Sequence, residues 1–339
     1  MKRTIPILLA VAVLSLPMMA SANPAAWRLQ GWKTDFTIAA VSFDEIISGG
    51  PPRDGIPPID KPTFKTIAEV DDVAAREPVI VYPLNASARA YPLRVLMWHE
   101  IVNDTVDGRP VAVTYCPLCN ASIVFDRRVN GRVLDFGTTG LLRKSDLVMW
   151  DRQTESWWQQ FSGEAIVGSF VGTSLKLLPS QVMSFEQFRA RWPKGLVLVP
   201  TDPGFRQYGR NPYSNYEDAP APFLYRGNLP KGVPSMAKIV IARHGKMRPA
   251  VSLALLAERR EVALEGVTFR WRPGQASALG AAEIAKGKDV GTVEVVDASG
   301  QPMVHDITFA FVFHAFVTGA TVLTDKGLVR LATGEAVEQ

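Results

Sequence analysis

Hydrophobic residues in this chain come mostly in short runs separated by glycine, proline and asparagine. Short β-branched runs bounded by turn residues are typical of strands, whereas amphipathic helices need a longer window of apolar positions with a period near 3.6. The strands that this pattern predicts include residues 78–82, 111–115, 122–125, 196–199, 238–242 and 311–316. Short helices are predicted at residues 93–100, 185–192 and 251–259.

We therefore expect a strand-dominated α+β fold, with short helices and mixed or antiparallel sheets in two packed lobes. Residues 23–77, rich in Pro, Gly and Asp, are expected to wrap the domain as an irregular segment with aromatic anchors such as Trp27 and Trp32. The predicted organisation is a core lobe at 78–200, a connecting loop at 201–235 and a second β-rich lobe at 236–339.

One internal similarity crosses the two lobes. A strand, a turn and an Arg-led entry into a helix occur at residues 79–96 and again at 239–255. An ancient duplication and a chance likeness of two strand–helix units both account for this pattern.

The first 22 residues have the pattern of a secretory signal. Lys2 and Arg3 precede an apolar run too short to span a bilayer, and Ala20-Ser21-Ala22 fits the small residues of a cleavage site. We expect a periplasmic or secreted protein that begins near Asn23 and has no membrane span after cleavage.

Charge adds little to this prediction. The formal net charge is +4 at pH 7, and loss of Lys2 and Arg3 leaves +2. A nearly neutral exported chain gives no reason to expect a nucleic-acid partner, and the sequence indicates no other partner.

The two cysteines of the chain, Cys116 and Cys119, form a Cys-x-x-Cys motif between two predicted strands. Such a pair has three interpretations, namely half of a metal site, a redox dithiol or a structural disulfide. A hairpin turning at Asn130-Gly131 follows the motif, whereas a thioredoxin-type motif would open a helix. This context favours a metal site at the bend.

His99, seventeen residues before Cys116, is the nearest histidine in sequence and the candidate third ligand. Two thiolates and an imidazole suit zinc or Cu(I), so copper or zinc is the expected metal. The alternative is a histidine that caps a turn. His314 lies in the apolar run at 311–316 and is expected to be a core residue or a second ligand.

A second group of polar and aromatic residues surrounds Trp158. Asp151, Trp158 and Gln160 are candidates for a ligand-binding cleft, with the indole as a platform. The alternative for Asp151 is a β-turn in which its carboxylate bonds its own backbone. The sequence lacks a Gly-x-Ser-x-Gly elbow, a phosphate loop, a dinucleotide fingerprint and a His-Glu-x-x-His helix, so no catalytic residue is assigned.

Several of these segments together resemble the DUF3179 family, a domain of unknown function found in exported bacterial and archaeal proteins. The segments are His99-Glu100-Ile101-Val102-Asn103-Asp104, the stretch Val113 to Cys119, Phe136-Gly137-Thr138-Thr139-Gly140, and the block from Ser145 to Gly163. Our leading hypothesis is an exported protein that binds copper or zinc at Cys116, Cys119 and His99. The alternatives are dithiol–disulfide redox by the same pair and a non-catalytic binding or structural module.

Overall fold

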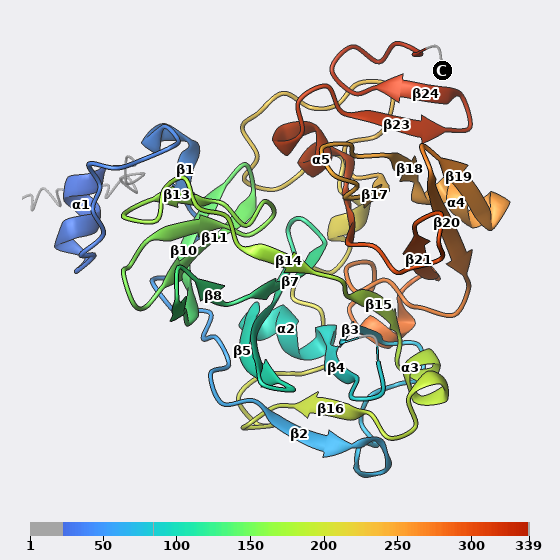
Figure 1. The fold of residues 1–339 in the computed structure, drawn as a ribbon, viewed down its shortest axis with the longest axis horizontal. Helices are drawn as coiled ribbons and strands as arrows, with labels where there is room; N and C mark the ends of the chain where they lie inside the picture. The colour runs from blue at the N-terminus through green and yellow to red at the C-terminus, as the bar shows by residue number, and fades with distance from the viewer. Residues whose placement is uncertain (1–22, 84, 338–339) are drawn as a thin grey trace, which may run out of the picture.

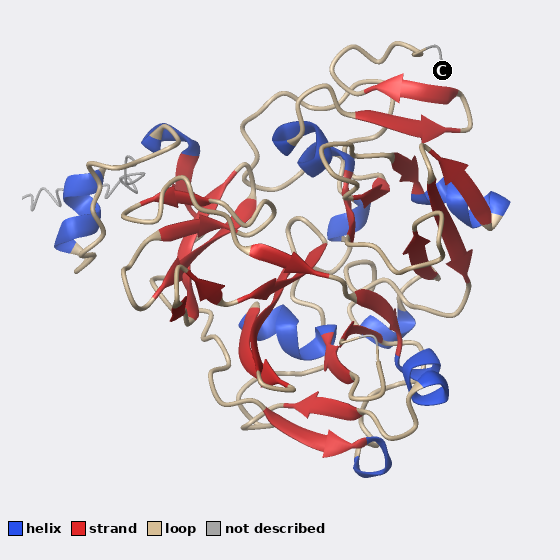
Figure 2. Ribbon diagram, in the orientation of Figure 1, coloured by secondary structure: helices blue, strands red, loops and turns tan. Residues whose placement is uncertain are grey.

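The computed structural model describes residues 23–83 and 85–337, so the predicted signal peptide lies outside the described residues. The fold is 38% strand and 15% helix, and its five main sheets have a five-blade, β-propeller-like arrangement. Figure 1 shows the order of the elements along the chain. The prediction of an α+β fold in two packed lobes is therefore wrong. Figure 2 shows how strongly strands outweigh helices.

The first three sheets contain most of the first two-thirds of the chain. Sheet 1 has the order β1 (Ile46–Ser48), β10 (Phe136–Arg143), β11 (Asp146–Asp151), β12 (Trp157–Gln159) and β13 (Ala165–Val167). Sheet 2 has the order β14 (Lys176–Leu178), β7 (Ala121–Asp126), β6 (Arg109–Cys116) and β5 (Ile101–Val106). Sheet 3 has the order β15 (Gln181–Ser184), β3 (Pro78–Tyr82), β4 (Arg89–Pro92), β16 (Leu196–Val199) and β2 (Thr63–Thr66).

The last two sheets come from the C-terminal third. Sheet 4 has the order β22 (His305–Phe309), β17 (Lys238–Ala242), β18 (Ala250–Ser252), β23 (Thr321–Thr324) and β24 (Gly327–Arg330). Sheet 5 has the order β19 (Glu261–Leu264), β20 (Val267–Arg272) and β21 (Thr292–Val296), and a small hairpin pairs β8 (Arg128–Val129) with β9 (Arg132–Val133).

The helices between these strands are short. They are α1 (Pro24–Leu29), α2 (Leu93–His99), α3 (Phe185–Arg191), α4 (Leu253–Arg259) and α5 (Ala310–Phe316). Single 3₁₀ turns are η1 (Phe43–Glu45), η2 (Ile67–Glu69), η3 (Tyr216–Asp218) and η4 (Ile284–Lys286). None of the helices in the described part of the chain has the length and apolar character needed to cross a membrane.

Two stretches of chain share one topological plan. In the first, β3 pairs antiparallel with β4 and β15, β4 leads into α2, and β16 joins parallel to β4. In the second, β17 pairs antiparallel with β18 and β22, β18 leads into α4, and β23 joins parallel to β18. After the helix, β5–β6–β7 corresponds to β19–β20–β21, because both are antiparallel meanders. The agreement of eight elements favours duplication over chance.

One hydrophobic core explains why two separate lobes do not form. The largest buried cluster contains Tyr115 and Cys116 from sheet 2 together with Ile239 and Phe309 from sheet 4. Residues 311–316, predicted as a strand, belong to α5, whose Phe311 and Phe313 are fully buried in this cluster. A short run that is apolar on every face has no periodicity to separate a buried helix from a buried strand, and this prediction is also wrong.

The N-terminal segment packs on sheet 1 through its aromatic residues. The rings of Trp27, Trp32 and Phe36 lie around Trp157, with centroids about 5 Å from it. Burial of such rings supplies most of the affinity of an irregular segment for a sheet.

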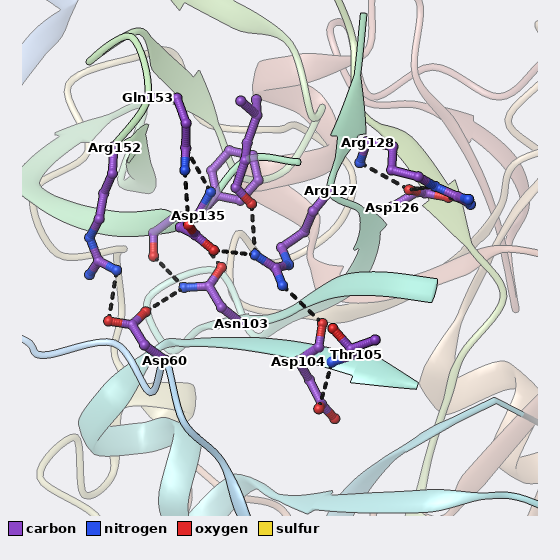
Figure 3. Close-up of polar contacts among 12 residues, drawn as sticks. Asp60, Asn103, Asp104, Thr105, Asp126, Arg127, Arg128, Asp135, Arg152 and Gln153 are labelled. Atoms are coloured by element: carbon purple, nitrogen blue, oxygen red, sulfur yellow. Dashed lines mark hydrogen bonds and ion pairs between the residues drawn. The ribbon is translucent and has the colours of Figure 1, made fainter. Parts of the chain in front are cut away.

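A polar network fixes the same segment to sheets 1 and 2 (Figure 3). The amide of Asn103 donates to Asp60 and to the carbonyl of Phe136, both at 2.8 Å. The buried guanidinium of Arg127 donates to the carbonyls of Leu134 and Asp104 and pairs with Asp135. Because most of its hydrogen-bonding groups have partners, we interpret this network as one that stabilises the packing of these segments.

Candidate metal centre

The two cysteines lie at the turn between β6 and β7, as the sequence pattern predicts. Cys116 ends β6, and the amide of Cys119 donates to its carbonyl at 3.2 Å. Asn120 takes a positive φ of 51°, and Ala121 begins β7 opposite Cys116. A tight turn of this kind directs both sulfurs to one side of the chain.

The turn is held from the other half of the molecule. The hydroxyl of Thr308 on β22 donates to the Cys119 carbonyl at 2.7 Å, and the Asn120 amide donates to the Ile307 carbonyl at 3.2 Å. Both cysteines are free thiols and almost fully buried, at 2% exposure for Cys116 and none for Cys119.

Asp146 brings a carboxylate to the sulfurs. It begins β11 after a turn in which Lys144 and Ser145 both have positive φ. One carboxylate oxygen of Asp146 and the two sulfurs lie within 4.8 Å of one another. Its Oδ2 accepts from the Phe161 amide at 2.9 Å and from the Gln159 side chain at 2.6 Å. Its Oδ1 is buried and has no hydrogen-bond partner in the described residues.

Burial dominates the electrostatics of this group. It raises the pKa of both thiols above the usual cysteine value, so the free thiols are neutral at pH 7. Burial also raises the pKa of Asp146 to about 6, although hydrogen bonds from Phe161 and Gln159 oppose the shift. The pKa of Glu100 is raised to about 8, by burial first and by the charge of Asp146 second.

His99 is not part of this group. Its Nδ1 lies 2.7 Å from the Pro57 carbonyl, which can only accept, so this nitrogen donates and Nε2 accepts from the Tyr208 hydroxyl at 2.8 Å. The ring stacks on Tyr208 and Phe205, with centroids 5.9 Å away in each case. Since both ring nitrogens form hydrogen bonds, His99 holds the segment around Tyr208 in place. The residue that lies next to the two sulfurs is Asp146.

The three residues of the predicted ligand cleft are all fully buried, and two of them, Asp151 and Trp158, are hydrogen-bonded to each other. The Asp151 carboxylate accepts from the Thr154 amide at 2.7 Å and from the Trp158 indole at 2.9 Å, which is the turn arrangement given as its alternative. Trp158 is fully buried between Phe136 and Phe170.

Gln160 lies close to the cysteine turn. Its amide donates to the Thr114 hydroxyl at 2.8 Å and to the carbonyl of Ala121, the partner of Cys116, at 3.2 Å. Of the three proposed cleft residues, Gln160 is therefore the one placed beside the cysteines.

A segment of the long loop covers the cysteine turn. The Tyr216 hydroxyl donates to the Leu118 carbonyl at 3.1 Å and accepts from the Phe223 amide at 3.4 Å. The Phe223 carbonyl accepts from the Ser145 hydroxyl, next to Asp146, at 2.6 Å. Glu217 anchors the segment by an ion pair with the buried Lys238 of β17. We call residues 211–225 the covering segment.

Sequence reasoning did not assign Asp146, Glu100 or Tyr216 to the site. In the sequence, Asp146 lies in the block from Ser145 to Gly163, and Glu100 directly follows His99, the candidate third ligand. The likeness of Ser145-Asp146 and His99-Glu100 to one family was the available signal, but a likeness of sequence does not say which side chains meet.

Comparison with known proteins gives a family and no function. A family model described as "Protein of unknown function (DUF3179)" matches residues 53–320, most of the chain, and confirms the resemblance seen in the sequence. No curated protein and no solved structure matches the chain.

Proposed function

Since the chain belongs to the DUF3179 family, whose description assigns no function, we propose from the site itself that this protein binds a thiophilic metal ion, zinc foremost, through Cys116, Cys119 and Asp146. We propose further that it does so as an exported protein, on the basis of residues 1–22 of the sequence.

The observation that carries the proposal is the closeness of two sulfurs to a carboxylate oxygen of Asp146, a fully buried residue whose Oδ1 has no hydrogen-bond partner in the described residues. Two donor atoms that each lie about 2.3 Å from one zinc ion are at most about 4.6 Å apart. The three atoms here lie within 4.8 Å of one another, so small side-chain adjustments suffice for ligation. A bound cation would also compensate the Asp146 oxygen, whose burial without a partner is costly.

The donor set favours zinc over copper. Cu(I) prefers soft thiolate and thioether ligands, whereas zinc accepts thiolates and carboxylates together. The third donor in this site is a carboxylate instead of the predicted imidazole. Copper is therefore the second candidate.

Burial counts against the redox alternative. Exchange with a partner thiol needs a reachable thiolate, but the sulfurs of Cys116 and Cys119 are buried and their pKa values are raised. Metal binding overcomes the same barrier, because the ion itself stabilises the thiolates and releases their protons.

The test uses protein recovered from the exported fraction under reducing conditions, with its N-terminus determined by mass spectrometry. The expected protein begins near Asn23, carries two free thiols after metal removal and binds about one zinc ion. Cys116→Ser and Asp146→Asn should weaken zinc binding by about tenfold or more, whereas Asp107→Asn, at an exposed turn, should not. A reduced, folded wild-type protein that binds neither zinc nor Cu(I) at micromolar concentration would exclude this function.

A further inference from the structure

Among the described residues, Asp146 forms no ion pair with the arginine that lies opposite it in sheet 1. Arg143 ends β10 and is the register partner of Asp146, the first residue of β11. Its guanidinium instead pairs with Glu45 of η1 at 2.7 Å. The side chain that bonds both Arg143 and Asp146 is that of Gln159, the last residue of β12.

Gln159 is fully buried, and its two partners fix the orientation of its amide. Arg143 donates to the Gln159 Oε1 at 3.2 Å, and the Gln159 Nε2 donates to the Asp146 Oδ2 at 2.6 Å. A guanidinium can only donate, and an ionised carboxylate can only accept. The amide therefore turns its oxygen to Arg143 and its NH₂ group to Asp146, and the opposite orientation would lose both hydrogen bonds.

The two oxygens of Asp146 are used unequally. Oδ2 accepts from the Gln159 side chain and from the Phe161 backbone amide at 2.9 Å, whereas Oδ1 has no partner in the described part of the chain. Two donors on one oxygen hold the carboxylate in place and leave its other oxygen free for a ligand. Hydrogen bonds of this kind orient ligating carboxylates in metal sites.

The uncharged amide also separates the metal ligand from a cation. A guanidinium bonded directly to Asp146 would often take both oxygens and would balance the negative charge, so a metal ion would have to displace it. Gln159 keeps Arg143 one side chain away, and Glu45 compensates the charge of Arg143. Asp146 is thus held by neutral N–H donors and keeps its negative charge for a metal ion.

We propose that Gln159 is a positioning residue of the metal centre, which is fixed by Arg143 and holds Asp146 so that its Oδ1 faces the metal ion. The inference rests on the proposed metal-binding function. It adds a residue that touches neither sulfur and that acts on the metal only through the carboxylate.

A double-mutant cycle on the reduced, metal-free full chain tests this role, with zinc affinity measured by competition with a chelating indicator. Gln159→Leu removes both hydrogen bonds at similar volume and should weaken zinc binding by about tenfold. Asp146→Asn keeps both thiolates and should still bind zinc measurably. In the Asp146→Asn background, Gln159→Leu should cause no further loss, because the two residues act as a unit.

Cobalt(II) spectra separate this role from general support of the cysteine turn. Gln159→Leu at saturating cobalt should keep the sulfur-to-cobalt charge-transfer bands of the wild type, because the thiolates are untouched. The matched control is Gln181→Leu, at a buried glutamine whose amide donates to the Val293 carbonyl at 2.9 Å, and it should leave zinc affinity unchanged. Circular dichroism verifies that each variant is folded.

If Gln159→Leu does not fold, Arg143→Met serves in its place. It removes the donor that fixes the amide and should weaken zinc binding about threefold, again only when Asp146 is present. Wild-type affinity in the tested variant, an equal loss in both backgrounds, or loss of the charge-transfer bands in a folded variant would each overturn the positioning role and leave the three-ligand site standing. If the wild type binds no zinc, the proposed function and this inference both fail.

Discussion

In the metal-free protein, Glu100 should make stability fall as the pH rises, and Glu100→Gln should remove that loss. The pKa of Glu100 is raised from its ordinary value of 4.5 to about 8, mainly by burial. The unfolded chain therefore releases this proton near pH 4.5, whereas the folded chain keeps it until about pH 8. Because the folded state binds more protons in this window, the stability contribution is complete below pH 4.5 and is lost as the pH rises toward 8.

The magnitude follows from the width of that window. Each pH unit between 4.5 and 8 removes about 1.4 kcal/mol from the free energy of unfolding. The loss is about 3 kcal/mol at pH 7 and about 4 kcal/mol at pH 8, where half of the folded molecules have released the proton. Glutamine has nearly the same shape and no proton to lose, so Glu100→Gln should gain about these amounts relative to the wild type and nothing near pH 4.5.

Urea unfolding between pH 5 and 8, with chelator and reductant present and tryptophan fluorescence as the signal, measures this difference. The separation between the wild type and Glu100→Gln should widen steadily with pH. Glu258→Gln, an exposed position on α4, should run parallel to the wild type. A variant that is less stable than the wild type by the same amount at every pH would mean that Glu100 is ionised and paired in the folded protein, and would refute the reasoning.

Two further predictions concern the supports of the site. Arg127→Met should lower the free energy of unfolding by about 2–4 kcal/mol, because it leaves buried carbonyls without their hydrogen-bond donor. Arg128→Met, at a half-exposed neighbour, should stay close to the wild type in the same urea assay. Equal effects of the two substitutions would show that the buried bonds of Arg127 do not stabilise the fold. Tyr216→Phe removes the hydroxyl that ties the covering segment to Leu118, so maleimide should label the reduced cysteines about fivefold faster, as for a loss of about 1 kcal/mol. Tyr225→Phe is the control, because this hydroxyl at the end of the covering segment bonds the Asn228 carbonyl and not the cysteine turn. Equal labelling rates for all three proteins would show that the segment does not control access.

Local elements were predictable where the residues themselves fix the geometry. The β-branched runs on both sides of Cys116 and Cys119 became β6 and β7, and Asn130-Gly131 made the turn between β8 and β9. Ser184 caps α3 through a bond from the Gln187 amide, as its position before an apolar segment indicates. Each of these outcomes depends on contacts between residues close in sequence.

The number and arrangement of sheets depend on contacts that the sequence pattern does not contain. A short apolar run shows that a segment is buried, but not which sheet it joins, and residues 311–316 formed a helix inside a core shared by distant strands. The likeness of residues 79–96 and 239–255 was visible in the sequence. Its extent became clear only from the strand pairings, because few side chains of the two halves have stayed the same.

The third ligand, too, depends on contacts between distant residues that the sequence pattern does not contain. The sequence favours His99 because histidine is a common zinc ligand and His99 is the histidine nearest to Cys116 along the chain. A short distance along the chain, however, does not place the His99 side chain near Cys116, because His99 lies at the end of a helix and its direction depends on the local backbone. The His99 imidazole points toward Pro57 and Tyr208, which bond its two ring nitrogens. Asp146 reaches the sulfurs because the tight turn before β11 brings a different sheet to the cysteine hairpin. Because the proposed ligands come from two sheets, the packing of these sheets decides which side chains meet. The spacing of the Cys-x-x-Cys motif therefore does not indicate that Asp146 is the third ligand.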